Sequence, residues 1–276
     1  MIDMAIVAFV DVLGYKQLVQ RTMTNRETIR RLEGIFSQAT EMLDKVKSMS
    51  LDHPDPNLQD YYNKMASTLR ADLVSDTILS RLFLSKIDFS YPGFTEEETL
   101  CNAVHLFFQY LSMVCTLFIR NTGLILRGGI SMGSHYESEP VSGNRGLFIF
   151  SDAYINAYQL EQKAKMSRIL IDDALYAYLK EASYDTTKHL YKDDDGCKCF
   201  DFYSFLQHDE QSQDCLKNIQ QGLMANMRFS FEDPHALKKL VSFAKYHNRK
   251  ICKDQLDFEQ LAVDFGPFER LLNNHH

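Results

Sequence analysis

Two aspartates, Asp11 and Asp76, stand beside predicted strand ends in this chain. Asp11 follows the apolar run 4–10 and precedes Gly14, a pattern typical of a buried strand that ends in a carboxylate. If the two predicted strands are neighbours, both carboxylates reach one edge of a sheet. Hard cations such as Mg²⁺ and Mn²⁺ prefer oxygen ligands of this kind and also bind phosphate oxygens. A single aspartate at a strand end is more commonly a turn or helix-cap residue, so it is the pair that indicates a metal site.

The elements that must position these aspartates alternate between strands and helices. Alternating runs on both sides of Ser75-Asp76 predict a hairpin with Asp76 at or beside its turn. Glycines inside a strand, as in Arg127-Gly-Gly129, usually mark the close approach of another group to the backbone. Periodicity and turn residues predict the remaining elements: helix 15–47 with a break near 24–25, loop 51–63, hairpin 69–84, helix 97–121, strand 124–132, helix 152–165, strand 168–171, helix 173–182, a hairpin through 193–196, and helices from about 212 interrupted at 233–234.

This order of elements predicts an α+β fold in which helices cover a mixed or antiparallel sheet. The chain of 276 residues is long enough for one large domain or for one domain with an appended subdomain. We predict a core over residues 1–184, with a C-terminal hairpin and helical extension over 185–276 packed on it.

Composition and charge narrow the functional classes. Hydrophobic residues make up 45% of the chain and charged residues 24%, as in an ordinary folded protein with a substantial core. The net charge of −7 argues against binding to long nucleic acid, which requires a basic surface. It does not exclude a small anionic substrate, because bound cations neutralise carboxylates and phosphates locally.

The cysteines and the apolar segment 100–119 indicate in which cellular compartment the protein is expected. Six cysteines in a chain of this length do not resemble a disulfide scaffold, so we expect free thiols in a reducing cytoplasm. The segment 100–119 is about long enough to span a membrane. Its polar residues recur every three or four positions, which favours a buried helix with one wetter face. The sequence therefore predicts neither a signal peptide nor a membrane span.

Five short segments form an ordered pattern over about residues 5–173. They are Phe9-Val-Asp11-Val-Leu-Gly14-Tyr15, Val74-Ser-Asp76-Thr-Ile78, Leu126-Arg-Gly-Gly-Ile-Ser-Met-Gly133, Ala157-Tyr-Gln-Leu-Glu161 with Ala164, and Arg168-Ile-Leu-Ile-Asp172. Together they resemble the core of the class III nucleotidyl cyclases. They are most similar to the prokaryotic branch of pyrimidine cyclases that acts in Pycsar antiphage defence.

The resemblance implies a ferredoxin-like catalytic core and a two-metal site. Asp11 and Asp76, with the carbonyl group of Val12, would hold two divalent ions, Mn²⁺ or Mg²⁺. The backbone at Gly14 and Tyr15 would bind the β- and γ-phosphates at a helix N-terminus. The ribose 3′-hydroxyl would then attack the α-phosphorus in line and expel diphosphate.

Other positions of the cyclase pattern are only partly present in this chain. Asn156 is present where the family contacts ribose across a dimer, but Gln159 stands where purine cyclases carry an arginine. A transition-state arginine would have to come from elsewhere, for example Arg127 or Arg168. Arg127 is equally well explained as a phosphate ligand or as a structural ion-pair residue.

The base-selecting positions favour a pyrimidine. Asp72 stands where purine cyclases place a base-reading lysine, and Arg70 lies two residues earlier on the same strand face. Arg70 could donate to a pyrimidine carbonyl group and Asp72 could accept from an amino group. Alternatively, both side chains form the polar face of a half-exposed strand.

The resemblance thus implies a cytoplasmic homodimer with composite sites that converts UTP to 3′,5′-cyclic UMP, with CTP as an alternative substrate. The product would activate a separate effector. Two other hypotheses remain open: a purine cyclase with an unusual base pocket, and an inactive nucleotide-binding or dimerisation module. None of these hypotheses requires a nucleic acid or a membrane.

Overall fold

The computed structural model describes residues 2–22, 25–49, 55–138, 148–206, 209–253 and 261–274. The strands in these ranges are β1 (Asp3–Leu13), β2 (Leu69–Val74), β3 (Thr77–Phe83), β4 (Ile125–Glu137), β5 (Ile149–Ser151), β6 (Ile169–Ile171), β7 (Leu190–Lys192) and β8 (Lys198–Phe200). The α-helices are α1 (Tyr15–Thr22), α2 (Arg26–Met49), α3 (Pro56–Ser67), α4 (Glu96–Thr122), α5 (Asp152–Ala164), α6 (Asp173–Glu181), α7 (Glu210–Phe229), α8 (Pro234–Lys253) and α10 (Gly266–Asn274).

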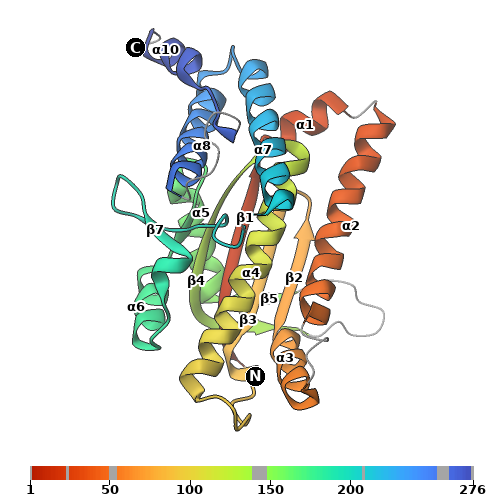
Figure 1. Ribbon diagram of the computed structural model, residues 1–276, viewed down its shortest axis with the longest axis vertical. Coiled ribbons are helices and arrows are strands. Elements are labelled where there is room, and N and C mark those ends of the chain that lie inside the picture. Colours follow the sequence, from red (N-terminus) through yellow and green to blue (C-terminus); the bar gives the residue numbers. More distant parts are fainter. Residues whose placement is uncertain are drawn as a thin grey trace.

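The strands form one mixed sheet, which confirms the predicted α+β fold. Its order is β2-β3-β1-β4-β6-β8-β7, and β5 pairs with β4 outside this path. The pairing of β4 with β6 is parallel, whereas the other pairings between described strands are antiparallel. Figure 1 shows α4 crossing one face of the sheet, with α2 beside it and α5 behind the sheet.

Strand β1 is the central strand and is buried on both faces. Ile6, Ala8 and Val10 belong to the large apolar core that includes α4. Ala5 and Val7 point the other way and pack against α5. Successive side chains of a strand alternate between faces, so a strand covered on both sides needs a continuous apolar run. This explains why the segment shows no polar alternation.

Helix α4 is the long apolar helix that the sequence predicts. Its first turn is held by a capping box between Thr95 and Glu98, and it ends at Gly123, whose φ of 66° is the left-handed conformation that glycine adopts easily. By length and composition α4 could cross a membrane, but 72% of its most apolar window is buried inside the protein. The predicted buried helix is confirmed.

Helix α5 approaches the sheet closely at a glycine, as the sequence predicts. A Cβ atom on Gly129 would lie 2.2 Å from the carbonyl oxygen of Ala157 and 2.4 Å from the Cβ of Leu160. Gly133, farther along β4, faces the backbone of Ala153 in the same helix. Small residues on β4 therefore bring α5 down onto the strand.

Several predicted boundaries were wrong. Strand β1 continues through Asp11 to Leu13, because β3 and β4 still pair with it there. The predicted loop 51–63 contains the start of α3, since the side chain of Asp55 accepts from the backbone of Asn57 and a proline occupies the first turn. Residues 51–54 of that loop lie outside the described residues.

The C-terminal region is built onto the same sheet. Strand β8 pairs with β6, so the sheet runs across the domain boundary that the sequence predicts at residue 184. A polar network fixes α8 to this hairpin: the Tyr246 hydroxyl donates to Asp201 over 2.6 Å, and Lys250 forms an ion pair with the same carboxylate over 3.1 Å. Helix α7 also packs closely against the end of α4. A Cβ on Gly222 of α7 would lie only 2.8 Å from the Cα of Gly123.

Candidate active site

The structure brings Asp11 and Asp76 together. Asp11 pairs with Thr77 across the β1–β3 ladder, and Asp76 occupies the turn that joins β2 to β3. The backbone N–H of Val12 donates to the carbonyl oxygen of Asp76 over 2.8 Å. Asp76 therefore lies beside β1 at the level of Asp11, although Asp11 lies inside its strand and not at the end.

The surroundings of Asp11 are negatively charged. Burial, followed by the charges of Asp76 and Glu161, raises the pKa of Asp11 to about 6. The cations Arg127 and Lys239 act in the opposite direction and do not compensate fully. A carboxylate that is still 24% exposed and is repelled by its neighbours is stabilised by a bound cation.

The oxygen ligands at this edge fit a Mg²⁺ or Mn²⁺ ion. Asp11 and Asp76 supply carboxylates, which together with backbone carbonyl groups are the hard ligands that these ions select. Such ions keep several waters and take phosphate oxygens, so a cage made only of protein is not required. Among the described residues there is no group of three or more His, Cys, Asp or Glu side chains that could hold a metal by itself.

Arg127 is held in an ion pair next to this site. It pairs with Asp11 across the β1–β4 ladder, and its Nη2 atom lies 3.7 Å from the Oδ2 atom of Asp11. The same guanidinium forms a closer ion pair with Glu161 of α5, whose side chain is almost fully buried. Of the two roles considered for Arg127, the structure shows the ion pair.

Gly14 and Tyr15 form the predicted strand-to-helix turn. Gly14 has a φ of 88°, and α1 begins at Tyr15. The carbonyl group of Gly14 accepts from the N–H of Leu18, so the preceding amide groups are the unpaired donors that open a helix. This helix N-terminus follows Asp11 by four residues, which places it at the predicted metal edge.

Arg70 and Asp72 lie on the same face of the sheet as Asp11, and both are in ion pairs. The guanidinium of Arg70 is 2.9 Å from Glu137, and Asp72 pairs with Arg81. Arg81 is fully buried, and its Nε atom lies 2.8 Å from the second oxygen of Glu137. Arg81 and Glu137 were not among the predicted site residues, although an arginine inside the apolar run of β3 was a visible signal.

The ion-pair network around Glu137 makes the stability of the fold depend on pH. Burial opposes the ionisation of Glu137, but its hydrogen bond with His135 and the neighbouring guanidinium groups prevail and lower its pKa to about 2. The ionised group therefore stabilises the fold above its ordinary pKa of about 4.5, and this contribution is lost as the pH falls toward 2.

We expect Glu137→Gln to lower the free energy of unfolding by about 3 kcal/mol at pH 7, because it leaves the Arg81 guanidinium buried with one partner fewer. The difference from the wild type should shrink below pH 4. Urea unfolding between pH 2 and 7 measures it, with the exposed Glu33→Gln as the matched control. Parallel stability profiles for wild type and Glu137→Gln would contradict this assignment.

Among the described residues, neither Asn156 nor Arg168 forms an ion pair or hydrogen bond with Asp11 or Asp76. Asn156 is exposed on the outer side of α5, between Ile155 and Tyr158, which are 51% and 45% exposed. Arg168, the other arginine considered for the transition state, forms ion pairs with Asp193 and Asp195 of the β7–β8 turn. It is therefore engaged in joining β6 to the C-terminal hairpin.

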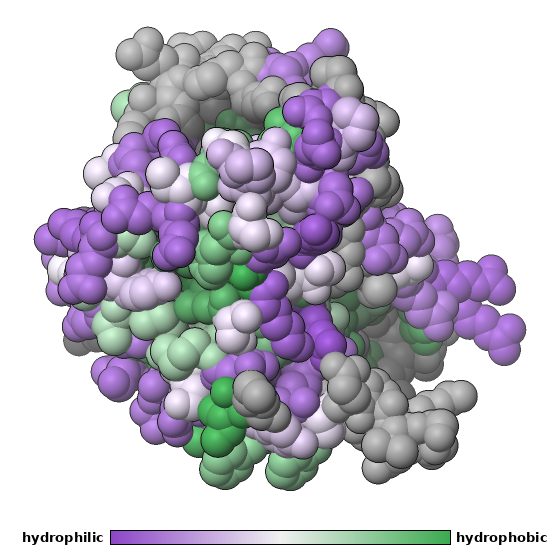
Figure 2. All heavy atoms as spheres, turned by 90° about the horizontal axis from the view of Figure 1, so that it is seen from below, coloured by the Kyte–Doolittle hydropathy of each residue, from purple (hydrophilic) through white to green (hydrophobic). Residues whose placement is uncertain are grey.

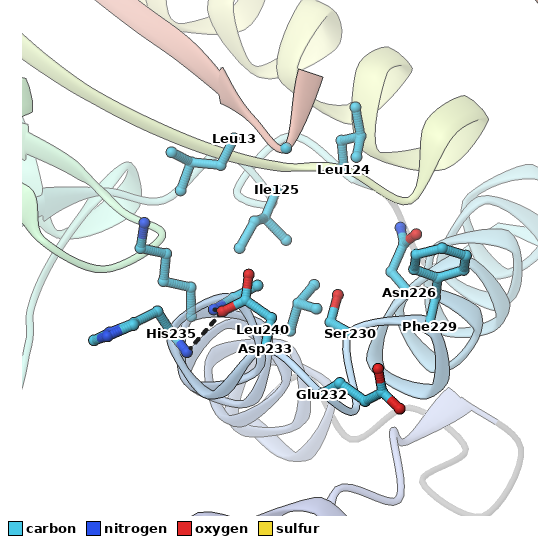
Figure 3. A pocket seen from close by; sticks show the side chains of 13 residues that line it. Leu13, Leu124, Ile125, Asn226, Phe229, Ser230, Glu232, Asp233, His235 and Leu240 are labelled. Atoms are coloured by element: carbon cyan, nitrogen blue, oxygen red, sulfur yellow. Dashed lines mark hydrogen bonds between the residues drawn. The ribbon is translucent and has the colours of Figure 1, made fainter. Parts of the chain in front are cut away.

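A cavity of about 530 Å³ adjoins the site at the end of β1. Leu13 and Ile125, which pair across β1 and β4, form one wall. The opposite wall comes from the end of α7 and the first turns of α8, a region for which the sequence predicts no role in the site. Figure 3 shows Leu13 and Ile125 above the start of α8, where Asp233 accepts a hydrogen bond from the backbone of His235.

Solved structures of adenylyl and guanylyl cyclases are similar to this chain. No protein-family model matches the chain, and no curated protein matches it in sequence. The adenylyl cyclase CyaB from P. aeruginosa is similar over 66% of this chain and 82% of its own, with 14% identity and a TM-score of 0.39. The guanylate cyclase domain of RhGC from Catenaria anguillulae, solved with GTP, is similar over 71% and 93%, with 14% identity and a TM-score of 0.42. The dimeric guanylyl cyclase domain of RhoGC from Blastocladiella emersonii covers 72% and 92%, with 12% identity and a TM-score of 0.41.

Proposed function

We propose that this chain is a metal-dependent nucleotidyl cyclase whose reaction takes place at the Asp11–Asp76 edge of the sheet. The observation that carries the proposal is the juxtaposition of these two carboxylates beside the turn at Gly14, where α1 begins. Carboxylates that bind cations, next to backbone amides that bind phosphate, are what a nucleoside triphosphate requires. The ordered sequence pattern around the same residues supports the cyclisation reaction.

In this proposal the residues take the roles that the sequence resemblance implies. Asp11 and Asp76 bind the two cations, with the carbonyl group of Val12 as a further ligand. When bound, the cations lower the pKa of the ribose 3′-hydroxyl and neutralise the triphosphate. The amides at Gly14 and Tyr15 orient the β- and γ-phosphates, so that the 3′-oxygen attacks the α-phosphorus in line with the departing diphosphate.

UTP is the substrate that we propose, with CTP as the alternative. Arg70 and Asp72 stand on the sheet face that carries Asp11 and present a donor and an acceptor within one ion-pair network. The uridine preference follows the sequence resemblance, as does the role of cyclic UMP as a messenger for a separate effector in cytoplasmic antiphage defence.

A second copy of the chain would complete the site. The outer side of α5, strand β5 and the residue before β5 expose large apolar side chains, among them Phe148 and Phe150, which are 59% and 69% exposed. Figure 2, which views the molecule of Figure 1 from below, shows further apolar surface that is exposed. Asn156 lies among the exposed residues of α5, from which it would contact the ribose in the partner's site.

Turnover of the four common nucleoside triphosphates tests the proposal. The purified protein is incubated with Mn²⁺ and each of ATP, GTP, CTP and UTP, and the cyclic product and diphosphate are identified by mass. We expect cyclic UMP, or cyclic CMP, and no product when a chelator removes the metal. A cyclic purine would keep the mechanism and overturn the base assignment. The absence of any product from a folded dimer would contradict the cyclase proposal.

One observation favours a second function, an inactive nucleotide-binding module. Gln159 replaces the arginine of purine cyclases, and both arginines considered in its place, Arg127 and Arg168, are in ion pairs. Such a module would still bind metal and triphosphate at Asp11 and Asp76. Binding of a triphosphate without turnover would therefore establish it.

A further inference from the structure

The cavity between β1 and α8 continues the candidate active site along the same face of the sheet. Leu13 and Ile125, in its wall, face each other one pair beyond Asp11 and Arg127 on that face. Two residues of a strand span about 7 Å. A chain of phosphates that starts at Asp11 and points along β1 therefore enters this cavity.

Lys239 brings a positive charge to the cavity from the C-terminal extension. It lines the same cavity as Gly14, the turn assigned to phosphate binding. Within the described ranges it forms no ion pair, whereas Arg127 is bound to Glu161. Its charge also reaches Asp11, whose pKa it lowers against the stronger effect of burial. Lys239 is thus a cation in the wall of this cavity that has no ion-pair partner among the described residues.

The position of Lys239 is fixed by the packing of α8. Phe243 and Tyr246, which follow Lys239 by four and seven residues, are buried against the core. Positions with this spacing share one side of a helix, so Lys239 lies on the side of α8 that faces the sheet. The hydrogen bond from Tyr246 to Asp201 anchors this side of the helix to the loop after β8.

The cavity also contains two acidic side chains, Glu232 and Asp233. Asp233 caps the start of α8: its carboxylate accepts hydrogen bonds from the N–H groups of His235 and Ala236 over 3.1 and 3.0 Å. Glu232 is exposed. Figure 3 shows the Asp233 carboxylate at the start of α8 with its hydrogen bond to His235, and Glu232 pointing away from Leu13 and Ile125. The wall near β1 is apolar.

We propose that Lys239 binds the terminal phosphates of the nucleoside triphosphate, and afterwards the diphosphate product, inside this cavity. The inference rests on the proposed cyclase function and adds to it that α8 is part of the active site. Lys239 would hold the leaving group while Asp11 and Asp76 hold the cations at the reacting end. The extension would then be required for binding of the triphosphate.

Diphosphate binding and turnover test this role separately. Titration calorimetry with Mg²⁺-diphosphate compares the wild type with Lys239→Gln, which keeps a polar side chain, one atom shorter, and removes its charge. We expect the affinity to fall about tenfold to a hundredfold, the range for a charged hydrogen bond. The KM for the triphosphate should rise by a similar factor, with a smaller change in kcat.

Two further variants show whether the charge itself is responsible. Lys238→Gln removes the neighbouring exposed lysine and should leave both measurements unchanged. Lys239→Arg should restore most of the affinity. Wild-type diphosphate affinity in Lys239→Gln, or no diphosphate binding by the wild type, would overturn the inference. If diphosphate binding depends on Lys239 but no triphosphate is cyclised, the cyclase proposal fails and the phosphate site stands.

Discussion

Replacing Asp11 by asparagine is expected to reduce cyclic nucleotide formation by about 1000-fold, equivalent to about 4 kcal/mol of transition-state stabilisation. The substitution keeps the shape of the side chain and removes the charge that a cation needs. Asp76→Asn should have an effect of the same order, because the two carboxylates act at one edge. The measurement is kcat/KM with Mn²⁺ and the preferred triphosphate.

The same substitution should not weaken the fold in the absence of metal. Burial and the neighbouring carboxylates disfavour the ionised form of Asp11 at neutral pH, because they raise its pKa to about 6. Removing that charge should therefore increase the free energy of unfolding by about 1–2 kcal/mol at pH 7. Asp44→Asn, an exposed position on α2, is the matched control for both readouts. A metal-free Asp11→Asn protein that unfolds more easily than the wild type would indicate a structural role for the carboxylate.

Gly129→Ala is expected to destabilise the protein by about 3 kcal/mol, a large effect for one methyl group. The added Cβ would lie 2.2 Å from the carbonyl oxygen of Ala157, so the backbone of α5 must move away from β4. Movement of α5 also displaces Glu161, which holds Arg127 beside Asp11. We therefore expect activity to fall together with stability.

The control for this prediction is the same substitution at a glycine with free space. A Cβ on Gly34 of α2 meets no atom within 4 Å, and alanine has the higher helix propensity. Gly34→Ala should therefore stabilise the protein by up to about 1 kcal/mol. Urea unfolding measures the stability of both variants. Equal stability of Gly129→Ala and the wild type would show that α5 is not held against β4 as described.

Local patterns in the sequence were sufficient for the elements around the site. The apolar run before Asp11, the paired runs around Asp76 and the glycine after α4 each reflect interactions of neighbouring residues. The close approach at Gly129 was also predictable, because a glycine weakens a strand and usually occurs there where another group must come close to the backbone. Helix α3 was missed because the prolines beside Asp55 were interpreted as loop residues, whereas Asp55 caps the helix and Pro56 begins it.

The parts of the site that could not be predicted depend on long-range packing. Arg81 and Glu137 meet across the sheet, 56 positions apart in the sequence, and no local pattern marks them as a pair. Lys239 reaches the cavity only because α8 folds back over the end of β1. Its sequence neighbourhood resembles an ordinary amphipathic helix. Periodicity identifies the buried side of such a helix but not the element that it covers.

Binding of Mn²⁺ tests the metal site at Asp11 and Asp76 most directly. Electron paramagnetic resonance counts the bound ions in the wild type, in Asp11→Asn and in Asp76→Asn, each with a triphosphate whose ribose lacks the 3′-hydroxyl and cannot cyclise. We predict about two Mn²⁺ ions per site in the wild type and weaker binding with fewer ions in each variant. Equal binding in all three proteins would contradict the assignment of these aspartates as metal ligands and, with it, the proposed mechanism.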